Sequence, residues 1–210
     1  GDFIYSKAFM LMNEIGNFKV IDELSSATNK IAEGELMQLA NKNNLNTSLQ
    51  QLKKISYYKT GRLFEASAKS AAMLSGKSIP FIENISKAAK LIGIAFQVRD
   101  DLLDYGVSKG NIGKPEMQDI LEDKITYPLY FALKYSNKKD SSKILKKLKN
   151  KDFSIEEVAD FVSSSNAFNK CNSLIQNYNN EISKCINQIS NKEIRDEMLN
   201  LSESLKNRYE

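Results

Sequence analysis

The chain has 210 residues, of which 41% are hydrophobic and 27% charged, and its net charge is only +4. This is the composition of a globular protein large enough to bury a core. Its lack of histidine excludes Ser–His and Cys–His catalysis and imidazole metal sites from these residues. Because the lysines are scattered and lack interleaved aromatic residues, we expect no nucleic-acid partner.

Two cysteines, Cys171 and Cys185, are too few for a disulfide framework and lack the spacing of zinc ligands. We interpret them as reduced thiols of a cytoplasmic protein. No apolar run approaches the roughly 18 residues that a membrane-spanning helix needs, so we expect no transmembrane segment.

Helical periodicity begins with residues 17–40, and a polar connector, NKNNLNTS, follows at 41–48. Thr47 or Ser48 is expected to cap the next helix. The apolar positions that define the first helical face are Val20, Leu24, Ala27, Ile31 and Leu39.

A second long helix is predicted from Leu49 to near Gly76, and a third from about Phe81 to Tyr105. The apolar face of the second comprises Leu49, Leu52, Ile55, Leu63, Phe64, Ala68, Ala71 and Ala72. No window alternates with period two, so the sequence predicts an all-α fold without strands.

The clearest break is GVSKGNIGKPEMQD at 106–119, which concentrates three glycines and a proline. Because a helical pattern resumes around Pro128 to Lys134, we interpret residues 106–118 as a flap loop within a single helical domain, 1–210. The basic stretch after Ser136 is interpreted as a solvated helix face and loop. Further along, the helical spacing of Tyr178, Ile182, Cys185 and Ile189 places Cys185 in the core.

The stretch FQVRDDLLDY, residues 96–105, carries three aspartates in a helix that otherwise looks buried. At about 100° per residue, Asp100, Asp101 and Asp104 share an arc of about 100° with Gln97. The opposite side is apolar and consists of Leu91, Ile92, Ala95, Leu102 and Leu103. The helix therefore has an apolar back and an acidic front, and we expect that front not to be a dry core face.

A solvent-exposed acidic helix face is the alternative explanation of this cluster. Against it, no basic residue lies at i+3 or i+4 on the arc, and aspartate is a poor helix former in mid-helix. Clustered hard oxygen ligands suit Mg²⁺, which leaves its remaining positions to water and phosphate. Lys109 and Lys114 on the flap, and Lys124 beyond it, would clamp a polyphosphate against such an ion.

The aspartates, the GK at 113–114 and D-x-x-x-x-K-x-T-x-P at 119–128 resemble the second aspartate-rich region of trans-isoprenyl diphosphate synthases, the polyprenyl synthetases. Three upstream segments resemble further motifs of that family: GDFIYSKAF at 1–9, IAEGELMQL at 31–39 and YKTGRLFEA at 58–66. In order and spacing these motifs cover residues 1 to about 134. The opening GDFIYSKAF is more similar to long-chain synthases, such as octaprenyl enzymes that make quinone side chains.

This resemblance implies a bundle of antiparallel helices around a deep central cavity, usually as a homodimer. It implies Mg²⁺-dependent head-to-tail condensation of isopentenyl diphosphate with an allylic diphosphate such as farnesyl or geranyl diphosphate. It also implies a peripheral membrane contact when the product is released. By position in the motifs, the metal ligands are Asp100, Asp101 and Asp104. The diphosphate-binding lysines are Lys59, Lys114 and Lys124, and the oxygens facing the cationic centre belong to Thr60 and Gln97.

Two features depart from the family. Asp123 stands where members usually have glycine. The family also carries a first aspartate-rich motif ahead of the Gly-Asp opening, with which this sequence begins. We therefore expect a chain that lacks the N-terminal helices and is inactive by itself. The alternatives are a non-catalytic partner subunit of a heteromeric synthase, a short-chain (farnesyl or geranylgeranyl) synthase, and a terpene cyclase. The lysine flap fits the condensing enzymes better than a terpene cyclase.

Overall fold

A computed structural model describes residues 1–106 and 117–204, and within these ranges every regular element is a helix. The elements are α1 (Asp2–Ile15), α2 (Phe18–Ala40), α3 (Leu49–Ser56), the π-helix η1 (Tyr57–Gly61), α4 (Arg62–Leu74), α5 (Ile79–Asp104), α6 (Gln118–Leu121), α7 (Tyr127–Tyr135), α8 (Lys138–Asn150), α9 (Ile155–Ser164), α10 (Ala167–Ile186) and α11 (Lys192–Ser204). The prediction of an all-α fold is confirmed. The predicted flap lies almost wholly outside the described residues.

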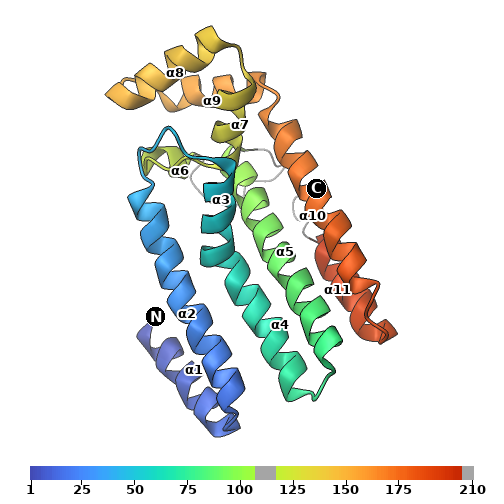
Figure 1. The fold of residues 1–210 in the computed structure, drawn as a ribbon. Coiled ribbons are helices and arrows are strands. Elements are labelled where there is room, and N and C mark those ends of the chain that lie inside the picture. Colours follow the sequence, from blue (N-terminus) through green and yellow to red (C-terminus); the bar gives the residue numbers. More distant parts are fainter. Residues whose placement is uncertain (107–116, 205–210) are drawn as a thin grey trace.

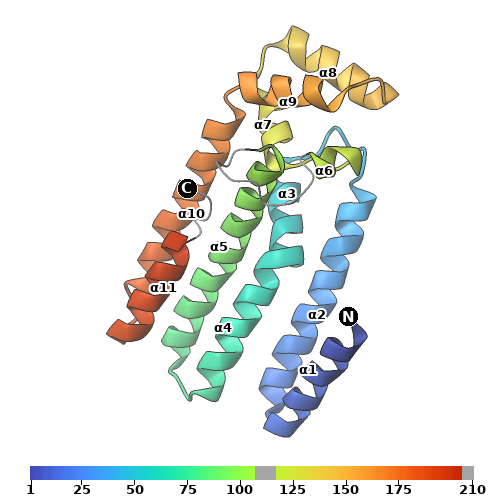
Figure 2. The ribbon, with the colours of Figure 1, turned by 180° about the vertical axis from the view of Figure 1, so that it is seen from behind.

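The long helices run side by side with alternating direction (Figure 1). In space their order is α1, α2, the continuous column α3–η1–α4, α5 and α10, and α11 packs beside α10. The view from behind shows the short helices α8 and α9 lying across one end of this bundle (Figure 2). The C-terminal ends of α2 and α5 both point toward that end, so residues from separate motifs can meet there.

Helix starts follow the expected capping chemistry. The side chain of Asn17 accepts hydrogen bonds from the backbone of Lys19 and Val20 and so caps α2. Of the two cap candidates for the next helix, Ser48 is the cap, since its hydroxyl accepts from the Gln51 amide. Thr47 is buried instead, and its hydroxyl bonds within the connector.

The second predicted helix is interrupted, because five residues between α3 and α4 form the π-helix η1. A π turn adds a residue, which rotates the following side chains by about 100° relative to an unbroken α-helix. Leu63, predicted in the core, is 50% exposed, whereas Arg62 is buried. The predicted apolar face was wrong at Leu63 and Ala71, which are exposed, whereas Ala72 is buried and Phe64 and Ala68 pack against the core clusters.

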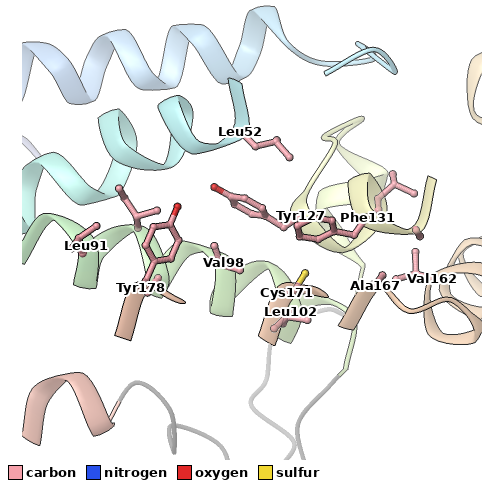
Figure 3. Close-up of a cluster of buried hydrophobic side chains, with 14 of the residues drawn as sticks. Leu52, Leu91, Val98, Leu102, Tyr127, Phe131, Val162, Ala167, Cys171 and Tyr178 are labelled. Atoms are coloured by element: carbon pink, nitrogen blue, oxygen red, sulfur yellow. The ribbon is translucent and has the colours of Figure 1, made fainter. Parts of the chain in front are cut away.

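The main hydrophobic core lies where α5, α7 and α10 meet (Figure 3). Val98 and Leu102 of α5 pack there with Tyr127 of α7 and Cys171 of α10, all of them buried. The predicted face of Tyr178, Ile182, Cys185 and Ile189 is buried at every position, so the placement of Cys185 in the core is confirmed.

The basic stretch after Ser136 folds mostly into α8, which buries Ser141 and Ile144 and leaves most of its lysines toward solvent. This agrees with the predicted solvated helix face. In the part of the chain that the structure describes, no helix combines the length and apolarity needed to cross a bilayer.

Candidate active site

Lys59 and Thr60 lie on the π-helix η1, which sits between α2 and α5. Glycines make this close approach possible. A Cβ atom on Gly34 of α2 would lie 2.6 Å from the backbone nitrogen of Lys59, and one on Gly93 of α5 would lie 2.7 Å from the Cα of Gly61. Since real Cβ atoms do not come this near, only glycine fits at Gly34 and Gly93 without moving the π segment.

A chain of hydrogen bonds joins η1 to α5 and α7. The Thr60 hydroxyl donates to Oε1 of Gln97 at 2.9 Å, and Nε2 of Gln97 donates to Oδ1 of Asp101 at 2.9 Å. The other oxygen of Asp101 accepts from the backbone N–H of Tyr127 at 3.1 Å. Because a carboxylate only accepts, Asp101 turns the NH₂ group of Gln97 toward itself and the amide oxygen toward Thr60.

Asp101 corrects the picture of an open acidic front, because only 6% of it is exposed. Burial, helped by the negative charges of Asp119 and Asp100, raises the pKa of its carboxyl to about 7, although the bonds from Gln97 and Tyr127 oppose the shift. The helical arc was predicted correctly, but its depth was not. The rest of the protein covers the Asp101 edge of that arc.

The other two aspartates lie nearer solvent than Asp101. Asp104 accepts the backbone N–H groups of Gln118 and Asp119 at 3.0 Å each, which ties the end of α5 to the start of α6. Burial raises the pKa of Asp104, and the charge of Asp119 adds to the shift against the two backbone bonds. Asp100 is half-buried on the same turn.

The donor chemistry of these aspartates can be compared with the needs of a divalent cation. Carboxylate oxygens are the ligands that Mg²⁺ prefers, and each Asp101 and Asp104 oxygen keeps a lone pair beyond its present bond. Within residues 1–106 and 117–204, no three acidic or cysteine side chains are grouped closely enough to form a metal cage. The donors therefore fit an ion that is held partly through water.

Two of the three predicted lysines are described. Nζ of Lys59 donates to Oε1 of Gln38 at 2.7 Å and lies 3.4 Å from Glu35. Lys124 pairs with Asp119 at 3.0 Å and with Glu122 at 2.8 Å. Burial alone would lower the pKa of Lys124, but these two carboxylates outweigh it and raise the pKa, so the ammonium stays charged. Lys114 lies outside the described residues.

One pocket collects much of the predicted site. Its described lining is Gln38, Asn41, Leu52, Ile55, Ser56, Lys59, Gln97, Asp101, Lys124, Ile125, Thr126 and Tyr127. Four predicted residues, Lys59, Gln97, Asp101 and Lys124, thus share one cavity, and Thr60 joins it through Gln97. Asp100 and Asp104 are not among the described lining residues.

Several lining residues were not predicted. Gln38 lies within IAEGELMQL, but nothing in the spacing of α2 indicates that it meets Lys59 of η1. Thr126 is 4% exposed, and its buried hydroxyl lies beside that of Tyr105. The position of Thr126 in D-x-x-x-x-K-x-T-x-P was the one signal that could have singled it out.

Comparison with known proteins supports the resemblance that the motifs indicated. The family model described as polyprenyl synthetase matches residues 1–165. The chain is 38% identical to octaprenyl diphosphate synthase of Escherichia coli (strain K12) over 144 residues, which is 69% of this chain and 45% of that protein. It is 33% identical to an all-trans-nonaprenyl-diphosphate synthase (geranyl-diphosphate specific) of Rhodobacter capsulatus, over 81% of this chain and 53% of that protein.

The structural likeness extends further along the chain. A polyprenyl synthase from Caulobacter crescentus CB15, solved in complex with calcium and isoprenyl diphosphate, superposes with a TM-score of 0.91 at 26% identity. This match covers 100% of the present chain and 65% of that one. The chain spans about half the length of the curated relatives just described. On the match of its sequence to the family model and of its fold to a solved member, this chain belongs to the polyprenyl synthetase family.

Proposed function

We propose that the complete protein is a polyprenyl diphosphate synthase that condenses isopentenyl diphosphate head-to-tail with an allylic diphosphate. The observation that carries this proposal is the chain Thr60–Gln97–Asp101, which borders a pocket that also holds Lys59 and Lys124. The oxygens of Thr60 and Gln97 suit a carbocation, and the ammonium groups of Lys59 and Lys124 suit a diphosphate. Together with the Asp101 carboxylate, they fit a substrate that separates into these two ions.

In the proposed reaction, Lys59, Lys114 and Lys124 bind the allylic diphosphate, and its C–O bond breaks to leave an allylic cation. The oxygens of Thr60 and Gln97 stabilise that cation, and the amide of Gln97 is held in the required orientation by Asp101. The double bond of isopentenyl diphosphate then attacks the cation, and the new cation gives up a proton to the released diphosphate. Lys59 and Lys124 must exchange part of their present carboxylate and amide contacts for phosphate oxygens.

Asp100, Asp101 and Asp104 are the residues that would hold Mg²⁺, directly or through water. The chemistry that bound Mg²⁺ supplies is neutralisation of the charge that develops on the leaving diphosphate. A cation there would also relieve the repulsion that Asp119 and Asp100 exert on the buried Asp101 carboxylate.

A long-chain product is the specific form of the proposal. The relatives are named for octaprenyl and nonaprenyl products, which supports a quinone side-chain length over farnesyl or geranylgeranyl diphosphate. The two cysteines are free and buried, which supports a reducing compartment, and we propose the cytoplasm. A peripheral membrane contact would receive so apolar a product.

We also propose that the protein forms a homodimer. Helix α1 buries none of its residues, and both it and the start of α2 expose large apolar side chains. They are Phe3, Ile4, Tyr5, Phe9, Met10, Leu11, Ile15 and Phe18. Exposed apolar groups in this number are typical of a surface that another polypeptide covers.

The test is incorporation of isopentenyl diphosphate by the complete protein with farnesyl or geranyl diphosphate and Mg²⁺, with the chain length of the product measured chromatographically. Asp100→Ala and Lys114→Ala should each lower kcat/KM by roughly 100-fold or more, because charge stabilisation of the leaving group is lost. The matched controls are Asp160→Ala on α9 and Lys146→Ala on α8, both exposed and remote from the pocket. Full activity in the two site variants, or no activity of the wild type without a second subunit, would refute the proposal.

A further inference from the structure

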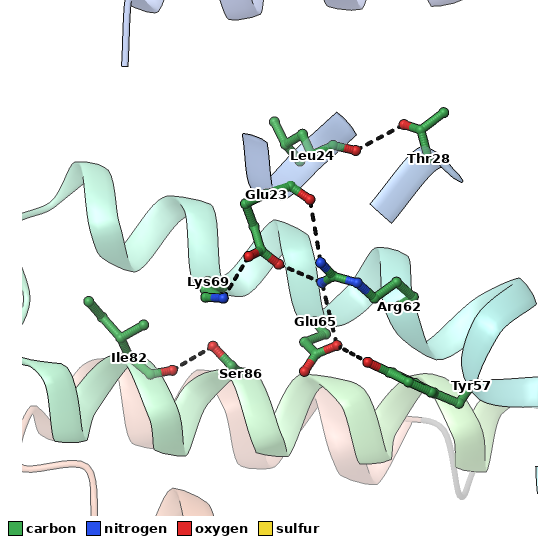
Figure 4. A network of polar contacts seen from close by, with 9 residues as sticks. All are labelled: Glu23, Leu24, Thr28, Tyr57, Arg62, Glu65, Lys69, Ile82 and Ser86. Carbon is green, nitrogen blue, oxygen red and sulfur yellow. Dashed lines mark hydrogen bonds and ion pairs between the residues drawn. The ribbon is translucent and has the colours of Figure 1, made fainter. Parts of the chain in front are cut away.

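The π-helix η1 is tied down at both ends by a polar network that lies outside the pocket (Figure 4). Tyr57, its first residue, donates its hydroxyl to Oε2 of Glu65 at 2.7 Å. Arg62, which follows the last residue of η1, lies 3.4 Å from the same oxygen. One carboxylate of α4 thus holds the residues on either side of Lys59 and Thr60.

The same network reaches across to α2. Arg62 pairs with Glu23, and the other oxygen of Glu23 accepts from Lys69 at 2.6 Å. Glu23 and Arg62 are both 8% exposed. The two cations lower the pKa of Glu23 against the effect of its burial, so it stays ionised. A buried charge is tolerated only when paired, which makes this contact between α2 and α4 specific in its geometry.

Tyr57 is half-buried and also contacts α5. The ammonium of Lys90 lies 4.1 Å from the centre of its ring. Burial, and then the hydrogen bond to Glu65, raises the pKa of the Tyr57 hydroxyl well above its usual value. Tyr57 is therefore a neutral hydrogen-bond donor at any working pH.

The π segment needs such support, because its hydrogen bonding is less favourable than that of an α-helix. If the segment relaxed to α, the side chains after the extra residue would rotate by about 100°, carrying Thr60 away from Gln97. Of the described residues that line the pocket, none belongs to the network of Tyr57, Arg62, Glu65 and Glu23. These four residues therefore act on the site indirectly, through η1 and through α2, which carries both Glu23 and the pocket residue Gln38.

We propose that Tyr57, Arg62, Glu65 and Glu23 form a clamp that sets the π turn, and that they are positioning residues for Lys59 and Thr60. This inference rests on the proposed condensation. The hydroxyl of Tyr57 is the sharpest point to test, since its removal deletes one hydrogen bond and leaves the ring in place.

The first experiment measures condensation kinetics of the complete protein with Tyr57→Phe. kcat should fall by about tenfold and KM for the allylic diphosphate should rise, because misplacement of reacting groups by a fraction of an ångström is costly. Glu65→Ala should behave alike, and Glu65→Gln, whose amide oxygen still accepts from Tyr57, should recover most of the loss. In a Thr60→Ala background, Tyr57→Phe should add little, since residues that act through one another are not additive.

Lys69→Met is the matched control. It removes the outer partner of Glu23 but leaves the Tyr57–Glu65 bond intact, so it should lower the melting temperature without changing kcat or KM. If the wild type is active and Tyr57→Phe has the same kcat and KM, the clamp is refuted but the proposed function is not. An inactive wild type would instead overturn the proposed function. In that case, crystal structures of wild type and Tyr57→Phe decide the clamp independently, because an unaltered π turn in the variant would refute it.

Discussion

Asp101 is the residue on which burial and function compete most directly. Its carboxylate is almost fully enclosed and accepts from the Gln97 side chain and the Tyr127 backbone, yet acidic neighbours repel its charge. In the metal-free protein these effects place its pKa near neutrality, at about 7 instead of 3.8.

This shift predicts a pH dependence of stability. Between an unfolded pKa near 3.8 and a folded pKa of about 7, the native state binds more protons than the unfolded state. The free energy of unfolding therefore falls as the pH rises through this window. In EDTA, Asp101 should make the wild type about 2–3 kcal/mol less stable at pH 8 than at pH 5.

Urea unfolding of wild type and Asp101→Asn at the two pH values measures this effect. The variant should lack this part of the decline in stability with pH, because asparagine does not titrate. Gln97 can reverse its amide and still form a hydrogen bond with the asparagine. Comparing the two proteins removes the contributions of other titrating groups. A difference in stability between them that stays constant with pH would contradict the prediction.

The positions of the site residues were predicted unevenly, for a physical reason. The helical arc of Asp100, Asp101 and Asp104 follows from spacing within one helix, and Lys59 with Thr60 follows from a motif. Whether an aspartate on that arc is covered depends on α7, whose backbone meets Asp101 from 26 residues further along the chain. Burial at such a contact depends on how two helices pack, so the spacing within one helix does not predict it.

At the scale of elements, the decisive feature is the insertion of η1 between two helical glycines. The periodicity of residues 49–76 indicates a helix but cannot reveal the extra residue, because apolar and small residues continue through it.

Gly34→Ala and Gly93→Ala should each lower the free energy of unfolding by about 1–3 kcal/mol, as overpacking does. This loss is expected although alanine favours a helix over glycine by about 1 kcal/mol. The added methyl groups would collide with backbone atoms of Lys59 and Gly61, which cannot rotate away. Urea unfolding monitored by circular dichroism measures the change.

Gly76→Ala provides the comparison for this prediction. A Cβ there meets nothing within 4 Å, but the backbone has a positive φ of 61°. Its cost should be about 1 kcal/mol from conformation alone. If Gly34→Ala were as stable as the wild type, the close packing of η1 against α2 would not hold.

At the scale of the whole molecule, α10 closes the core against α5 and α7 and carries both cysteines. Cys171 is fully buried, Cys185 is 5% exposed, and burial raises the pKa of the Cys171 thiol well above its usual value. Both thiols should therefore react with a thiol reagent only when α10 leaves the core.

Labelling of the native protein tests this expectation. Both cysteines should react slowly and at the same rate, in step with global unfolding, because they belong to one helix. A cysteine introduced at the exposed Ser163 should react at once and serves as the control. Rapid modification of Cys171 or Cys185 under native conditions would show that α10 opens separately.

The sequence by itself determined the helical class, the main helices, the shared arc of the aspartates and the family, because each depends on spacing within one segment or on ordered motifs. Only the tertiary structure decided the depth of Asp101, the π turn, the pairing of Lys59 with Gln38 and the clamp around Tyr57. Those features arise where helices distant in sequence cross. The register of one helix against another is set by the packing of the assembled bundle, in which a single glycine or inserted residue changes which side chains meet.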